Sequence, residues 1–220
     1  MASPANRIEP RRRAARLYLQ APQVTDPAGV ADALAAALGA ADVAAVLLAL
    51  PPADDRTLIT NAKTLAPLVQ SKGAALVLAG HADLAARAGA DGAHLTGIDA
   101  FQVALTTLKP ARIAGCGGLR TRHDAMLAGE AGADYVMFGE PDAQARRPSF
   151  DAIVERIAWW AELFEITCVG FAAAIEEVGP LADAGADFIA VGDCIFGDAR
   201  GPAVAIADVA RRLAPAETVG

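Results

Sequence analysis

Charged and imidazole side chains follow several of the short apolar segments that this sequence predicts to be strands. His81, Asp99, Arg120, Glu140 and Asp193 each stand a few residues after such a segment. A carboxylate pair combined with an imidazole and a guanidinium can move protons on a small anionic substrate. The sequence therefore predicts acid–base catalysis by Glu140, Asp193, Arg120 and His81. The alternative is that Asp99 caps the fourth helix and Asp193 the short turn after the eighth strand.

A second group of residues has the chemistry of an anion site. Arg147 follows the same apolar segment as Glu140, and a guanidinium fork suits phosphate. Gly117 and Gly118 lie in the turn CGGL, where backbone N–H groups and the start of the next helix can bind an anion. A plain tight turn is the alternative. Cys116 beside them is either a reactive thiol or a small buried residue.

The composition predicts a single globular domain with a large core. The 220 residues are 54% hydrophobic and 5% aromatic, and carry a net charge of −7. This excludes a disordered chain and disfavours a nucleic-acid binder, which usually has a basic face. The three cysteines, Cys116, Cys168 and Cys194, are too far apart for a zinc motif and fit a reducing cytoplasm.

Two stretches near the N-terminus could suggest a targeting or membrane segment, and the sequence favours neither. The stretch after Arg16 is too short and polar for the apolar part of a signal peptide. The apolar residues 33–52 contain Asp42, Gly39 and a Pro-Pro pair, so a helix, a turn and a buried strand explain them better. We expect a flexible basic arm over residues 1–15, a barrel over 16–214, a tail over 215–220, and no membrane partner.

A repeated phrase decides the architecture. Gly-Ala-Asp precedes an apolar run in AGADGAHL, AGADYVMF and AGADFIAV. In each copy a glycine ends a helix, and a turn and then a strand that is apolar on both faces follow it. This order indicates a parallel sheet that is covered on both sides. The predicted strands are residues 16–20, 44–49, 75–79, 92–95, 112–115, 135–138, 168–171 and 188–191. The predicted helices are 27–40, 57–71, 82–88, 100–108, 121–131, 150–163, 175–184 and 202–213.

Eight strand–helix units predict an α/β fold, a compact (β/α)8 TIM barrel, with a doubly wound open sheet as the alternative. The chemistry then belongs in the loops after the strands. We expect His94, inside the strand 92–95, to be structural. Trp159 and Trp160 are expected to pack in a helix, one inward and one partly outward. A homodimer contact through them is the alternative.

With these loops in place, the chain resembles the thiamine phosphate synthase family and its thiazole tautomerase branch. The similar phrases are RLYLQAPQVTD, HADLAARAGADGAHLTGID, AGADYVMFGEP and AGADFIAVGDCIF, and the resemblance runs from about Arg16 to Leu213. Members of the family join a pyrimidine diphosphate to a thiazole phosphate and release pyrophosphate, with magnesium. The tautomerase branch aromatises the thiazole phosphate.

The resemblance implies roles for particular positions, and several family residue types are replaced. The second-strand Gln, Arg and Lys that hold the diphosphate correspond to Leu47, Ala49 and Pro51. The first magnesium carboxylate corresponds to His81 and the second to Asp99, which is retained. The resemblance thus implies magnesium as the cofactor with Asp99 as a ligand.

The remaining positions concern phosphate. A family His after the fifth strand corresponds to Arg120, and the Lys after the sixth strand to Arg147. The Gly-Gly pair of the seventh strand corresponds to Gly170-Phe171, and the Ile-Ser pair of the eighth strand to Gly192-Asp193. The resemblance therefore implies phosphate contacts at Arg147, Gly170 and Gly192.

Three functions remain open at this point. The first is the family enzyme of thiamine biosynthesis. The second is an enzyme for another small anionic metabolite, built on Glu140, Asp193, Arg120 and His81. The third is a non-catalytic barrel that binds thiamine-related ligands. Each implies a small phosphorylated metabolite as partner and a cytoplasmic location.

Overall fold

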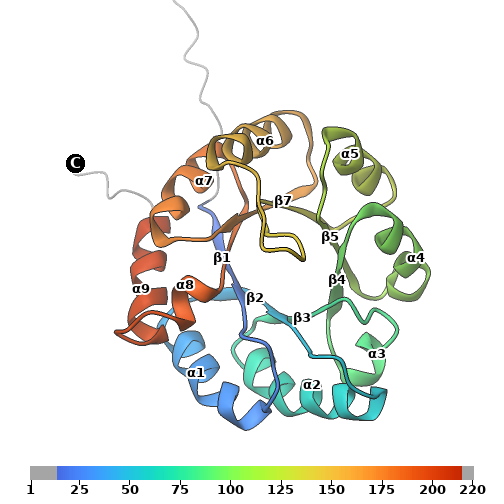
Figure 1. Ribbon diagram of the computed structural model, residues 1–220, viewed down its shortest axis with the longest axis vertical. Helices are drawn as coiled ribbons and strands as arrows, with labels where there is room; N and C mark the ends of the chain where they lie inside the picture. Colours follow the sequence, from blue (N-terminus) through green and yellow to red (C-terminus); the bar gives the residue numbers. More distant parts are fainter. Residues whose placement is uncertain (1–13, 215–220) are drawn as a thin grey trace, which may run out of the picture.

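Eight short apolar strands pair in parallel, in chain order, and close on themselves because β1 pairs with both β2 and β8 (Figure 1). The computed structural model describes residues 14–214. The strands are β1 Arg16–Gln20, β2 Val43–Leu48, β3 Ala75–Ala79, β4 Gly92–Thr96, β5 Ile113–Gly117, β6 Tyr135–Phe138, β7 Thr167–Ala172 and β8 Phe188–Val191. The (β/α)8 barrel predicted from the sequence is confirmed, and the open sheet was the wrong alternative.

Helices surround this barrel and follow each strand. They are α1 Pro27–Ala40, α2 Asp55–Gln70, α3 Ala85–Ala88, α4 Ile98–Leu108, α5 Arg122–Glu130, α6 Phe150–Leu163, α7 Val178–Ala184, α8 Asp193–Phe196 and α9 Pro202–Leu213, with a 3-10 turn, Ile175–Glu177, before α7. The predicted strand positions are confirmed to within two residues at either end. The short helix α8 was not predicted. The expected arm lies almost wholly, and the tail wholly, outside the described residues.

Local chemistry explains where several helices begin. Asp26 caps α1 by accepting hydrogen bonds from the backbone N–H groups of Ala28 and Gly29. Thr121 and Asp124 form a capping box at α5. The alternative that Asp99 caps the fourth helix and Asp193 the short turn after the eighth strand was wrong. Glycines hold the N-cap positions of α4 and α8, and neither helix has a side-chain cap.

The aspartate of the repeated Gly-Ala-Asp phrase joins neighbouring strands at the amino end of the barrel. Asp91 accepts a hydrogen bond from the Leu76 backbone N–H of β3 at 2.7 Å. Asp134 does the same for Ala114 of β5 at 2.7 Å, and Asp187 for Cys168 of β7 at 2.8 Å. Each aspartate also donates its own N–H to the carbonyl of the same residue. The phrase therefore sets the strand register at three places.

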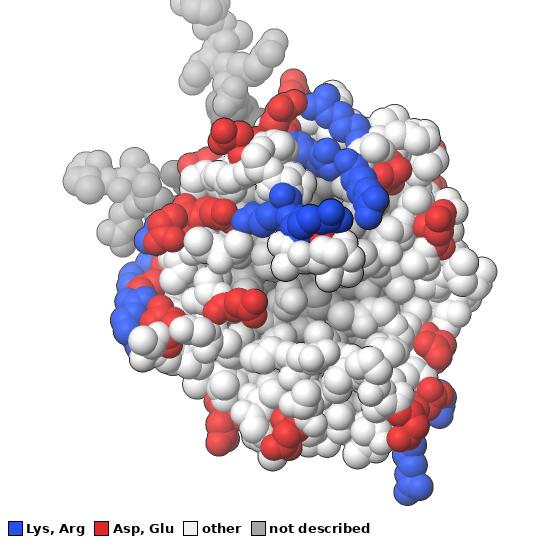
Figure 2. Space-filling model, in the orientation of Figure 1, with Lys and Arg blue, Asp and Glu red and all other residues white. Residues whose placement is uncertain are grey.

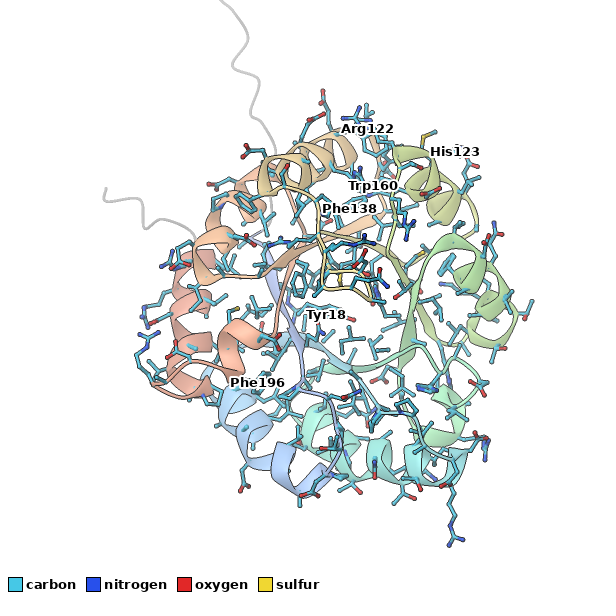
Figure 3. The ribbon with its side chains drawn as sticks, in the orientation of Figure 1. Tyr18, Arg122, His123, Phe138, Trp160 and Phe196 are labelled. Carbon is cyan, nitrogen blue, oxygen red and sulfur yellow. The ribbon has the colours of Figure 1, made fainter. Side chains whose placement is uncertain are left out.

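The core has two layers. Between the barrel and the helices lies the larger apolar layer, in which Phe138 contacts Trp160 of α6 with ring centroids 5.9 Å apart (Figure 3). Trp160 is fully buried and Trp159 partly so, as predicted. A smaller layer fills the inside of the barrel and includes Tyr18, Leu47 and Tyr135. Tyr18 lies near the centre of the barrel in Figure 3. Within residues 14–214, no helix combines the length and apolarity needed to cross a membrane.

We expect Asp187→Ala to destabilise the protein by about 1–3 kcal/mol, because it removes the acceptor of the part-buried Cys168 N–H. Asp187→Asn keeps an acceptor oxygen and should cost less. Urea unfolding followed by circular dichroism measures both. Asp183→Ala, an exposed aspartate on the nearby helix α7, is the matched control. Equal stability of Asp187→Ala and Asp183→Ala would contradict this role.

Candidate active site

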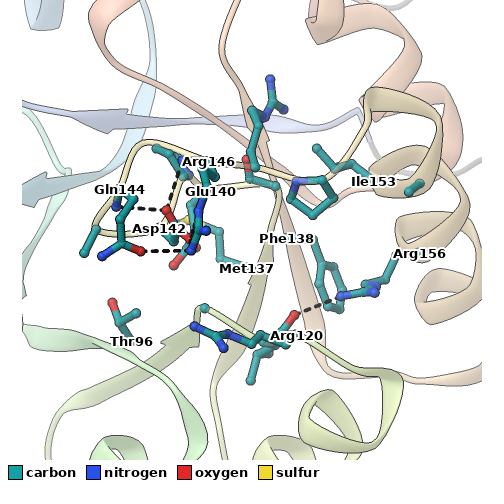
Figure 4. A pocket seen from close by; sticks show the side chains of 18 residues that line it. Thr96, Arg120, Met137, Phe138, Glu140, Asp142, Gln144, Arg146, Ile153 and Arg156 are labelled. Carbon is teal, nitrogen blue, oxygen red and sulfur yellow. Dashed lines mark hydrogen bonds and ion pairs between the residues drawn. The ribbon is translucent and has the colours of Figure 1, made fainter.

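A pocket of about 430 Å³ opens at the carboxyl ends of β4, β5 and β6. Its walls come from Thr96, the turn after β5, the loop from β6 to α6, and the first part of α6 (Figure 4). In Figure 1 this β6–α6 loop reaches over the centre of the barrel. The position agrees with the expectation that a parallel barrel carries its chemistry at this end.

Glu140 supplies one of the carboxylates that line the pocket. Its side chain is only 16% exposed, and its Oε1 lies 3.5 Å from His94 Nε2. Oε2 is buried and has no hydrogen-bond partner among the described residues. A Cβ at Gly117 would collide with both carboxylate oxygens, and one at Gly118 with Thr96. The glycines predicted for phosphate binding are thus required to admit Glu140 and Thr96.

Behind Glu140, a chain of polar side chains crosses the inside of the barrel. His94 Nδ1 lies 3.0 Å from the Tyr135 hydroxyl, which lies 2.8 Å from the Tyr18 hydroxyl. Burial raises the pKa of both phenols, so both remain O–H donors at neutral pH. The sequence predicted a structural role for His94 and did not reveal its link to Glu140. One signal was present: a histidine and two tyrosines stand in otherwise apolar strands.

The β6–α6 loop is held in shape by Asp142. Its carboxylate accepts hydrogen bonds from the backbone N–H groups of Gln144 and Arg146 and from the Arg146 guanidinium. These bonds lower the pKa of Asp142 to about 2. Asp142 and Arg146 therefore largely neutralise each other within the loop.

The Arg147 guanidinium, like that of Arg146, is bound to acceptors within the protein. Its NH1 group donates to both carboxylate oxygens of Glu177 at 2.9 Å, while Nε and NH2 donate to the carbonyls of Gly139 and Phe171. The pair is largely buried, with 20% and 18% of the two side chains exposed. Arg147 lines the pocket, yet its guanidinium connects the β6–α6 loop to the end of β7.

Two other arginines of the pocket keep N–H donors for a ligand. Arg120 is exposed, and its guanidinium has no partner among residues 14–214. Arg156 of α6 makes a single bond, from NH1 to the Leu119 carbonyl at 2.9 Å. Sequence analysis missed Arg156. The signal was its place between the buried residues Ile153, Ile157 and Trp160 on the inner face of α6.

The other predicted site residues lie outside this pocket. His81 follows β3 with a left-handed φ of 47°, Asp99 is exposed in the first turn of α4, and Asp193 is exposed at the start of α8. Gly170 lies inside β7, where a Cβ would press on Ile157. Gly192 precedes α8. The structure thus gathers Glu140, Arg120, Arg147 and Gly118, but not His81, Asp99 or Asp193.

The residues that the resemblance assigns to magnesium supply one carboxylate for the ion. Magnesium prefers carboxylate and phosphate oxygens in octahedral geometry. His81 offers a ring nitrogen where the family has a carboxylate, leaving Asp99 as the one acidic donor that the resemblance retains. No group of three or more His, Cys, Asp or Glu side chains is placed to hold a metal in the described part of the chain.

The turn at Cys116 offers little chemistry of its own. Cys116 is fully buried, and burial with the nearby Glu140 charge raises its pKa to about 12. The thiol is therefore protonated at neutral pH, which favours the buried interpretation over the reactive one. At the start of α5, Asp124 N–H is already bonded to the Thr121 side chain.

Fold and pocket together define a (β/α)8 barrel protein with an arginine-bearing site suited to a small phosphorylated ligand. The sequence profile of the family "Thiamine monophosphate synthase" matches residues 17–195. The chain is 42% identical to the thiamine-phosphate synthase of Rhodospirillum centenum, over 89% of this chain and 96% of that one. It is 33% identical to that of Hyphomonas neptunium, over 87% and 90%. This chain belongs to the thiamine monophosphate synthase family, a family of thiamine biosynthesis.

Solved structures agree on the fold. Thiamine phosphate pyrophosphorylase from Pyrococcus furiosus superposes with a TM-score of 0.76 at 22% identity, covering 91% of this chain and 96% of that one. A 3-hexulose-6-phosphate synthase superposes with a TM-score of 0.69 at 14% identity, covering 90% and 100%. At these identities the likeness concerns the barrel.

We expect Arg147→Lys to destabilise the protein by about 1–3 kcal/mol, since lysine cannot replace the fork to Glu177 and the two carbonyl contacts. Affinity for inorganic phosphate should stay within about twofold. Urea unfolding and calorimetric titration measure the two quantities, with Arg212→Lys on α9 as the surface control. Lost phosphate affinity at unchanged stability would instead support the role implied by the family.

Proposed function

We propose that this chain catalyses the family's condensation of a pyrimidine diphosphate with a thiazole phosphate, in the pocket of Glu140. The observation that carries this is the pair Arg120 and Arg156, whose unused N–H donors line that pocket. Their charge favours a phosphorylated ligand, and family membership supplies its chemical class.

The arginines can serve the bond-breaking step. When the bond between the pyrimidine's methylene carbon and the diphosphate oxygen breaks, the diphosphate leaves with the electron pair. Cations fixed beside it stabilise that developing charge. Charge-assisted hydrogen bonds are each worth about 1.5–3 kcal/mol. Two such hydrogen bonds, from Arg120 and Arg156, offset much of the binding energy of the family's diphosphate contacts. Those contacts are absent here, because Leu47, Ala49 and Pro51 occupy their positions.

The surface charge supports this location. Figure 2 shows Lys and Arg side chains gathered in a band on the face that carries the opening, above a hollow bordered largely by uncharged residues. Anion recognition in this chain would therefore lie on the side of β5 and β6. The acid–base role of Glu140 belongs to the same proposal, as does a cytoplasmic location, which the free cysteines support.

A second candidate is a barrel that binds thiamine phosphates without turnover. The apolar residues at positions 47, 49 and 51 favour it, because the family places diphosphate contacts there. Both candidates share the pocket and differ in whether product forms. An enzyme for another anionic metabolite would bind neither thiamine phosphate nor its precursors.

We expect the purified protein to form thiamine phosphate from the two phosphorylated precursors, counted after oxidation to its fluorescent derivative. Arg120→Ala and Arg156→Ala should each lower kcat/KM by about 10–100-fold, because each removes a charge-assisted contact. Arg122→Ala is the control, since Arg122 pairs with Glu155 outside the pocket. A blank with clear thermal stabilisation by thiamine phosphate would indicate the second candidate. A blank without stabilisation would contradict both.

We expect binding of thiamine phosphate to be insensitive to magnesium, because the pocket meets phosphate with guanidinium groups. Removing divalent ions with EDTA, or introducing Asp99→Asn, should leave the dissociation constant within about twofold. Calorimetric titration with and without magnesium measures this. A tenfold loss on chelation that Asp99→Asn reproduces would restore Asp99 as a magnesium ligand.

A further inference from the structure

One acceptor of the pocket lacks a donor. Glu140 Oε2 is buried and unpartnered within the described residues, although its carboxylate lines the pocket. A buried carboxylate oxygen without a hydrogen bond costs about 1–3 kcal/mol or more. A ligand N–H group that reaches this oxygen would supply the missing hydrogen bond.

We propose that Glu140 Oε2 accepts a hydrogen bond from an N–H group of the bound ligand, and that His94 is the residue that positions this carboxylate. The ligand class is then a phosphorylated heteroaromatic molecule with an amino group or a protonated ring nitrogen. The arginines take its phosphate and Glu140 takes its nitrogen. This deepens the proposed function and rests on the same pocket.

The pocket has the shape and lining for such a ligand. About 430 Å³ lies within the range of small-molecule sites. Leu119, Met137, Phe138 and Ile153 contribute apolar wall that can contact a ring. In Figure 4, Arg120 and Thr96 lie on one side of the opening, and Glu140 and Asp142 on the other. A ring with phosphate at one end and nitrogen at another can therefore meet both groups.

The hydrogen-bonded chain explains how Glu140 is aimed. In the His94 tautomer that carries its proton on Nε2, this nitrogen donates to Glu140 Oε1 at 3.5 Å. Nδ1 must then accept from the Tyr135 hydroxyl at 3.0 Å, and Tyr135 must accept from Tyr18 at 2.8 Å. The Tyr18 hydroxyl thereby orients the Tyr135 hydroxyl, which in turn orients the His94 ring. Because Oε1 is occupied by His94, Oε2 is the oxygen left for the ligand.

Neighbouring packing keeps this arrangement rigid. The His94 and Tyr135 rings stack at 5.6 Å with an interplanar angle of 13°. Tyr18 meets Tyr135 edge to face at 5.7 Å. His94 is only 4% exposed. Changing Tyr135 to Phe keeps the ring packing and removes only the hydroxyl, which makes it the matched test of the chain.

The experiment compares two probes by calorimetric titration of the full chain. Thiamine phosphate carries an amino group and a phosphate, whereas inorganic phosphate carries no N–H. We expect the wild type to bind thiamine phosphate at least tenfold more tightly. Glu140→Gln should reduce that preference about tenfold, while affinity for inorganic phosphate stays equal or rises because a nearby negative charge is removed. Tyr135→Phe should reduce the preference several-fold, and Glu155→Gln, outside the pocket, should not.

Three results would overturn the inference. One is a wild type without preference for thiamine phosphate. The second is a preference that survives Glu140→Gln. The third is that Tyr135→Phe weakens both probes equally, which a purely structural role would produce. The turnover assay tests the proposed condensation separately from this inference. Product formed with an unchanged preference in Glu140→Gln removes this inference alone, and a blank assay with the preference lost in Glu140→Gln removes the condensation alone.

Discussion

The barrel depends on the register of its parallel strands, and three aspartates fix that register at the amino end. Asp91, Asp134 and Asp187 each exchange two hydrogen bonds with a residue of the preceding strand, one through the carboxylate and one through the backbone N–H. A shift of one residue would exchange the barrel's inner and outer faces. The polar chain from Tyr18 to Glu140 would then no longer form, because its members come from β1, β4 and β6 and the loop after β6.

Closure of the barrel also brings loops that are far apart in the sequence to one opening. The turn after β5 carries Arg120, the loop after β6 carries Glu140, and α6 carries Arg156. Gly117 and Gly118 allow the carboxylate and Thr96 to approach the backbone closely. The site is therefore produced by the fold together with two glycines at which a side chain would displace Glu140 or Thr96.

The sequence predicted most of the fold because its signals were local. Continuous apolarity marked the strands, and β1, β3, β6 and β8 were placed to the residue. The short helix α8 gives no comparable signal in four residues. The site was predicted only in part, because loop position shows which residues can meet and not which partners they choose. Arg147 looked like a phosphate ligand until Glu177, thirty positions away, proved to hold its guanidinium. His94 looked structural because its link to Glu140 joins β4 to the loop after β6.

The hydrogen-bond and ion-pair partners of the pocket's charged side chains determine what the pocket can bind. Four arginines line it, but Arg146 is paired with Asp142 and Arg147 with Glu177, so these two add little net charge. Arg120 and Arg156 keep their charge for a ligand. Glu140 has its own partial partner in His94, at 3.5 Å, which leaves one oxygen for a donor. A ligand that is anionic at one end and donates N–H at the other satisfies both groups. A ligand with only one of these features leaves either the two arginines or Glu140 Oε2 without a partner.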